Sequence, residues 1–118
     1  MGISIILPTE KKWAVYEVPP TDPNLKTGDS SNWGLTYFKD KNIYIDENLK
    51  PEHKIEVLRH EITHAVIFET QFTEVKRYTE EDICDLVGTY GKIICELADE
   101  VMNELQRKIK DSTDGEDN

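Results

Sequence analysis

The residues most able to do chemistry in this chain are two histidines one helical turn apart. They belong to the run HEITH, residues 60–64, inside a segment, 51–70, whose apolar spacing predicts a helix. Because positions i and i+4 share one face of a helix, His60 and His64 can point at the same spot. Two imidazoles placed this way can bind one Zn²⁺, and Glu61 can act on a water at that metal. The pattern predicts a zinc centre with Glu61 as its catalytic base.

A zinc site with two histidines needs a third protein ligand and keeps its fourth position for water. The candidates are acids of a second predicted helix, which starts after Thr79 as its N-cap and runs to about Lys110. Glu81 can bind the metal, and Asp85, on the same face one turn later, can accept the free ring N–H of a ligating histidine. Glu80 is the rival ligand. We favour Glu81 because, of the acids in this first turn, it alone has an acid four residues later.

The remaining histidine and the two cysteines are expected to lie outside the metal site. His53 precedes His60 by about 10 Å along the helix axis, which is too far for a shared metal. Cys84 and Cys95 fall in one predicted helix about 16 Å apart, beyond the reach of a disulfide. We expect Cys84 to be a small core residue. Free thiols suit a reducing, cytoplasmic setting.

Length and charge restrict the class of protein. The chain has 118 residues, which suits one domain, and we assign residues 1–110 to it. The net charge of −10 argues against nucleic acid as the main partner. No apolar stretch is long enough for a membrane span, and the N-terminus lacks the basic region of a signal peptide. Residues 111–118 carry four acids and no base, and are predicted to be a disordered acidic tail.

Four short runs rich in β-branched and aromatic residues precede the HEITH helix. Residues 3–7 and 13–18 can form one hairpin, and residues 35–38 and 42–46 a second, with Ile43 facing the core. The polar segment between the two hairpins, 19–34, is predicted to be a long loop. Trp33, near its end, could anchor this loop, but we favour a role in filling the edge of the core. In the second helix, Gly88 and Gly91 predict a close approach to the HEITH helix, which would let Glu81 reach the metal.

At this point the motifs resemble a known family. HExxH followed by E-x-x-x-D on the next helix resembles the gluzincin branch of the zincin metallopeptidases. The order of a hairpin, an HExxH helix and a nearby E-x-x-x-D helix is similar to the minimal zincin domains of phages and bacterial mobile elements, including the ImmA/IrrE-type peptidases. The resemblance covers residues 35–94. It implies the zinc ligands His60, His64 and Glu81, the catalytic Glu61, and Asp85 as support for a histidine.

The resemblance implies an α+β minimal zincin-like domain, with a small antiparallel sheet packed on the HExxH helix and a second long C-terminal helix. The expected function is a zinc-dependent metallopeptidase acting on a protein or peptide. The chain lacks an obvious helix before the sheet and a second domain to build the far wall of a cleft. Two alternatives therefore stay open: a non-catalytic zincin-fold zinc-binding interaction or regulatory protein, and one subunit of a two-chain peptidase whose partner protein completes the cleft.

Overall fold

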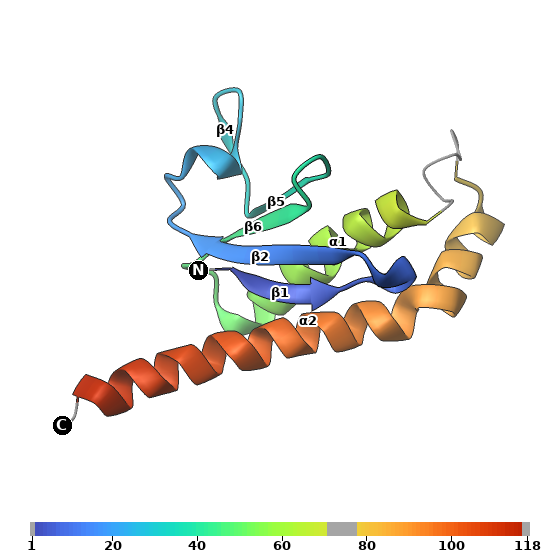
Figure 1. Cartoon of the computed structure of the whole chain (residues 1–118). Helices are drawn as coiled ribbons and strands as arrows, with labels where there is room; N and C mark the ends of the chain where they lie inside the picture. Colours follow the sequence, from blue (N-terminus) through green and yellow to red (C-terminus); the bar gives the residue numbers. More distant parts are fainter. Residues whose placement is uncertain (1, 71–77, 117–118) are drawn as a thin grey trace.

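The computed structural model describes residues 2–70 and 78–116, which form an α+β fold of two layers. One layer is a four-stranded sheet and the other consists of two helices that contact each other beneath it (Figure 1). The strands are β1 (Ile3–Ile6), β2 (Lys12–Val18), β5 (Gly34–Tyr37) and β6 (Asn42–Asp46). The helices are α1 (Pro51–Glu69) and α2 (Glu80–Glu116). Helix α1 packs against β5 and β6, and α2 packs against β1.

Both predicted hairpins are confirmed, but the sheet is mixed and not antiparallel as expected. Its order is β1-β2-β6-β5; the pairs β1–β2 and β5–β6 are antiparallel, whereas β2 and β6 run parallel. The second hairpin thus docks onto the first through β6. Ile43 and Ile45 on β6 are fully buried, so the more apolar strand takes the central position and β5 is left at the edge.

The core lies between the sheet and the two helices. Alternate residues of β1, β2 and β6 face it, as the period of a strand requires. The apolar spacing that predicted α1 corresponds to its buried face, on which four residues are fully buried and Ile55 is partly buried. The four are Leu58, Ile62, Ala65 and Val66. Within the described residues, no helix is long and apolar enough to cross a membrane.

The segment expected to be a long loop, 19–34, contains short elements. It forms the 3₁₀ turn η2 (Pro23–Leu25) and a small ladder of β3 (Lys26–Thr27) and β4 (Ser30–Ser31), before β5 begins at Gly34. Asp22 caps η2 by accepting a hydrogen bond from the backbone N of Asn24 at 2.7 Å. Leu25 is fully buried, so this segment is anchored to the domain by an apolar side chain.

The predicted start of α2 is confirmed, whereas its predicted end is not. The backbone N of Asp82 donates to Thr79 Oγ1 at 3.2 Å, and the backbone N of Thr79 donates to Asp82 Oδ2 at 2.9 Å. This reciprocal pair satisfies amides that the first helical turn leaves without partners.

The helix continues to Glu116 instead of ending near Lys110, so it overlaps the tail predicted at 111–118. No glycine or proline follows Lys110 until Gly115, and the helix meets no local stop. Most of the predicted connection, 70–78, lies outside the described residues.

Gly88 and Gly91 do not mark a close approach of α2 to α1, and the prediction made for them is wrong. A Cβ at Gly88 would meet nothing within 4 Å, and one at Gly91 would meet only Val87 of the same helix, at 3.3 Å. Ile83 is correspondingly exposed. Leu86 and Tyr90, later in the apolar stripe of α2, are partly buried against the core. The buried members of this stripe start at Ile94.

The cysteines are separate thiols, as the helical spacing predicted. Cys84 and Cys95 are both unbridged and exposed. The prediction that Cys84 fills the core is therefore wrong. It lies in the exposed first turns of α2, ahead of the buried part of the stripe.

Polar contacts hold both ends of α1 against the sheet. Near its start, the buried Lys54 donates to Glu17 of β2. At its end, Glu69 Oε2 accepts from Lys41 Nζ at 2.6 Å and from Trp13 Nε1 at 3.0 Å. Burial raises the pKa of Glu69, but these two hydrogen bonds and the nearby lysine charges outweigh it and hold the pKa below its ordinary value of 4.5.

Glu69→Gln is expected to lower the free energy of unfolding at neutral pH by about 1–3 kcal/mol, since it removes charge-assisted hydrogen bonds. Because the pKa of Glu69 is lower in the folded chain than in the unfolded chain, its contribution is present above pH 4.5 and is lost as the pH falls through the folded-state pKa. Urea unfolding of the wild type and of Glu69→Gln across this pH range measures the difference between their free energies of unfolding. This difference should fall to zero in acid. Glu96→Gln, at an exposed pair with Lys92, is the matched control. A difference in free energy that does not change with pH would contradict the lowered pKa of Glu69.

Candidate metal centre

His60 and His64 lie together on the exposed side of α1. Their rings are 4.9 Å apart between centroids, and their Nε2 atoms are 3.2 Å apart. Both side chains are exposed, although Glu61 and Ile62, which lie between them on the helix, are buried. The sequence prediction that the two imidazoles share one face is therefore met in the structure.

The spacing of the two Nε2 atoms suits a shared metal. Zinc binds imidazole nitrogen at about 2.0–2.1 Å in tetrahedral sites, which puts two such ligands about 3.3–3.4 Å apart. The observed Nε2···Nε2 distance of 3.2 Å is close to that separation. Neutral imidazole is also a ligand that zinc accepts readily. The donor chemistry and the spacing of this pair therefore fit zinc.

Glu61 is the buried member of the motif, and β5 holds its carboxylate in place. Glu61 is only 6% exposed, which is unusual for an acid. Thr36 Oγ1 donates to Glu61 Oε1 at 2.8 Å and also lies 3.2 Å from the backbone O of Glu61. The other carboxylate oxygen, Oε2, lies 3.9 Å from His60 Nε2. One oxygen is thus fixed by the sheet, and the other lies on the side of His60.

Gly34 allows β5 to lie this close to α1. A Cβ at this position would be 2.9 Å from Glu61 Cγ and 2.9 Å from Val57 Cγ1. Such distances are shorter than carbon atoms tolerate, so a larger residue would push the strand and the helix apart. Gly34 and Thr36 are two apart on the strand, and both therefore face α1.

A groove runs from Glu61 and His60 toward the start of α1. It has a volume of about 350 Å³. Its lining residues come from α1 and from the chain that enters β5: Asn32, Trp33, Gly34, His53, Glu56, Val57, His60 and Glu61. Trp33 is 61% exposed and packs edge-on against His53, with ring centroids 4.4 Å apart. The expectation that Trp33 fills the core edge is wrong, because its side chain is exposed and lines the groove.

The structure does not bring Glu81 to the histidine pair. Within residues 2–70 and 78–109, no group of three or more histidine, cysteine or acidic side chains is placed to hold a metal. Glu81 and its rival Glu80 are exposed in the first turn of α2, and Asp85 is exposed one turn later. The pair of histidines and the neighbouring Glu61 are therefore the parts of the predicted site that the structure assembles.

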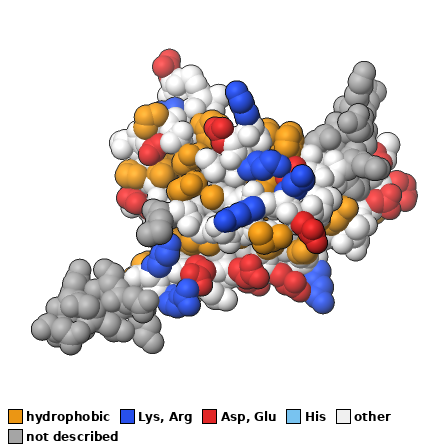
Figure 2. All heavy atoms as spheres, viewed as in Figure 1, with side chains coloured by type: hydrophobic (Ala, Val, Ile, Leu, Met, Phe, Trp, Pro, Cys, Tyr) orange, Lys and Arg blue, Asp and Glu red, His pale blue; other side chains and the backbone are white. Residues whose placement is uncertain are grey.

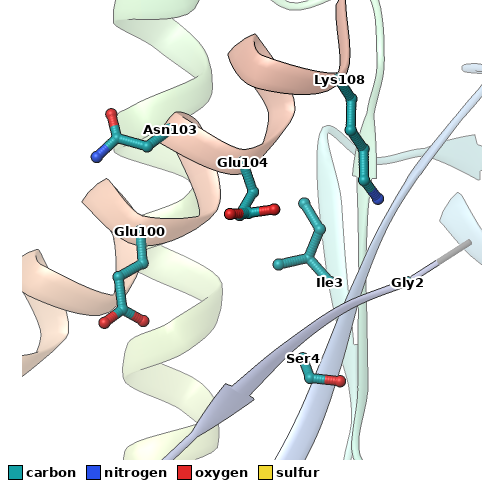
Figure 3. A pocket seen from close by; sticks show the side chains of 7 residues that line it. All are labelled: Gly2, Ile3, Ser4, Glu100, Asn103, Glu104 and Lys108. Atoms are coloured by element: carbon teal, nitrogen blue, oxygen red, sulfur yellow. The ribbon is translucent and has the colours of Figure 1, made fainter. Parts of the chain in front are cut away.

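A second hollow, of about 480 Å³, lies where α2 passes β1 (Figure 3). It is lined by Glu100, Asn103, Glu104 and Lys108 of α2 and by residues 2–4. Figure 2 shows acidic side chains in a row over α2 and lysine or arginine side chains over the strands. None of the motif residues lines this hollow, whereas His60 and Glu61 line the groove beside α1.

Sequence reasoning missed three residues of the site: Trp33, Gly34 and Thr36. Gly34 had a usable signal, because a glycine next to a strand pattern often marks a close backbone approach. Thr36 had none, since a threonine in a strand is ordinary. Its role follows only from the pairing that places β5 at the edge of the sheet, beside α1.

Comparisons with known proteins leave the family of the chain open. A scan of protein-family models, a search of curated proteins and a search of solved structures each found no significant match. The functional argument therefore rests on the geometry of the site.

Gly34→Ala is expected to destabilise the fold by about 1–3 kcal/mol, because the added methyl overpacks the contact with Glu61 and Val57. Gly88→Ala is the matched control. Its methyl would meet nothing within 4 Å, and it should stabilise α2 by up to about 1 kcal/mol. Thermal and urea unfolding measure both variants. Equal effects of the two substitutions would contradict the close approach described for β5.

Proposed function

We propose that this chain is a zinc-dependent metallopeptidase whose metal is held by His60 and His64 and whose general base is Glu61. The observation that carries the proposal is the Nε2···Nε2 distance of 3.2 Å, next to a buried carboxylate that has one oxygen fixed by Thr36 and the other 3.9 Å from His60 Nε2. The resemblance to minimal zincin domains supports the same assignment. The cytoplasm is the proposed location, since both thiols are unbridged.

The chain's own residues have separate tasks in this proposal. A bound zinc ion supplies Lewis acidity, which polarises a carbonyl oxygen and makes water more acidic. Glu61 Oε2 accepts a proton from the attacking water and returns it to the nitrogen of the leaving amine as the C–N bond breaks. Glu61 Oε1 stays bound to Thr36 Oγ1, so the base keeps its orientation.

An extended protein or peptide is the substrate class that the surroundings favour. Among the described strands, β5 pairs only with β6, which leaves its other edge open to a further strand. An extended peptide can add to such an edge by main-chain hydrogen bonds. The groove beside it offers the indole of Trp33 and the side chain of Val57 to a large apolar side chain of that peptide.

The third protein ligand is proposed separately, as Glu81, with Asp85 supporting a histidine. This assignment comes from the E-x-x-x-D pattern, and both acids are exposed on α2.

The isolation of the histidine pair from a third donor among the described residues favours a second candidate function. In it, the chain binds zinc without catalysis as an interaction or regulatory protein, or a partner protein completes the site of a two-chain peptidase.

Substitutions of the motif test the metal and the base independently. His60→Ala or His64→Ala should weaken zinc binding by at least about 100-fold, since each removes a metal ligand, whereas His53→Ala should leave the affinity unchanged. Glu81→Ala should weaken it and Glu80→Ala should not. Glu61→Gln should retain zinc and slow the cleavage of quenched fluorescent peptides by at least about 100-fold.

Calorimetric titration with zinc and a peptide cleavage assay give these two readouts. Zinc affinity that survives the loss of His60 or His64 would sink the metal centre. Zinc binding that requires the pair, together with cleavage that is absent or insensitive to Glu61→Gln, would instead support the non-catalytic candidate.

Trp33→Ala should raise the KM for peptides with a large apolar side chain by about 10- to 100-fold, because the contact that buries that side chain is lost. The effect on peptides that carry only small side chains should be much smaller, and Trp33→Phe should retain most of the affinity. Steady-state kinetics on two matched peptide sets measure the difference. The same KM increase for both sets would contradict a side-chain site at Trp33.

A further inference from the structure

Thr36 presents its side chain and its peptide groups in two different directions. The backbone N of Asp46 donates to the O of Trp33 at 2.9 Å, so the peptide groups of Trp33 face β6. Peptide groups alternate sides along an antiparallel strand. Given the register Thr36↔Ile43, the N–H and C=O of Thr36 therefore face the open edge of β5. Its hydroxyl faces α1 and contacts Glu61.

We propose that Thr36 is a positioning residue that couples the peptide-binding edge to the general base. Its hydroxyl fixes the Glu61 carboxylate, while its N–H and C=O are available to set the register of an extended peptide. The inference rests on the proposed peptidase function and adds a residue outside the HExxH motif. One residue of β5 thus relates the position of the substrate backbone to the orientation of the base.

The burial of Glu61 supports a role for this hydrogen bond. A buried carboxylate lowers stability unless its oxygens are satisfied, and an apolar residue would pack at this position at less cost. The torsion that rotates a glutamate carboxylate has broad minima, so packing alone leaves its oxygens loosely placed. The 2.8 Å bond from Thr36 Oγ1 selects Oε1 and leaves Oε2 facing His60.

The stiffness of Thr36 also suits this task. A β-branched side chain has few χ1 rotamers, so the hydroxyl stays in place when the strand backbone stays in place. Gly34 keeps that backbone against α1, because its missing Cβ lets the strand approach Glu61 and Val57. A peptide added to the open edge would restrain β5 further, and with it the hydroxyl.

The test compares Thr36→Val, which removes the hydroxyl and keeps the shape, with Thr36→Ser, which keeps the hydroxyl. The first readout needs no catalysis: the ¹³C resonance of the Glu61 side-chain carboxyl in the full chain, assigned by its loss in Glu61→Gln. It should shift in Thr36→Val and stay near its wild-type position in Thr36→Ser. The second readout is the cleavage of quenched fluorescent peptides by the zinc-loaded protein. Thr36→Val should lower kcat by about 10- to 100-fold with little change in KM, and Thr36→Ser should restore it.

Unfolding midpoints of both variants identify any loss of fold, and Thr36→Ala serves if Thr36→Val does not fold. An unmoved Glu61 resonance in Thr36→Val, or an unchanged kcat, overturns the proposal. A resonance that moves only when the hydroxyl is absent, in a wild-type protein that cleaves no peptide, has a different meaning: the fixing of Glu61 stands and the peptidase assignment fails.

Discussion

The close approach of β5 to α1 is the constraint on which the rest of the site depends. The strand and the helix can lie this close because Gly34 has no side chain. The side chains of Glu61 and Val57 occupy the space that a Cβ at Gly34 would need. Without this close approach, the Thr36 hydroxyl would not reach the Glu61 carboxylate, and that buried acid would lack its partner from the sheet. Trp33, the residue before Gly34, is exposed and lines the groove beside this contact.

Polar contacts hold helix α1 at three places along its length, and each of them helps to fix the position of the histidine pair. Lys54 bonds to Glu17 near the start of the helix, Thr36 bonds to Glu61 in its middle, and Glu69 bonds to Trp13 and Lys41 at its end. The buried stripe of the helix packs between these contacts. His60 and His64 therefore project from a rigid element toward solvent. Such support is what a preorganised metal or catalytic site requires.

Local patterns were sufficient to predict the four strands of the main sheet, the two long helices and the paired histidines. The i, i+4 spacing alone placed His60 and His64 on one face, and the Thr79 cap followed from side-chain chemistry within four residues. The parallel pairing of β2 with β6 could not be predicted, because it depends on which strand of a hairpin docks on a distant one. The prediction of a close helix approach at Gly88 failed because it also depends on tertiary structure. A helical glycine permits a close approach, but among the described residues no other element lies against Gly88.

X-ray absorption at the zinc edge of the zinc-loaded protein tests the central claim most directly. The account predicts one zinc ion per chain with nitrogen and oxygen neighbours at about 2.0–2.1 Å and the outer-shell scattering of two imidazoles. That imidazole signal should disappear when His60 and His64 are both replaced by alanine. Sulfur neighbours at about 2.3 Å would place the metal at the exposed cysteines. That result, or a spectrum unchanged in the double variant, would contradict a metal centre on α1.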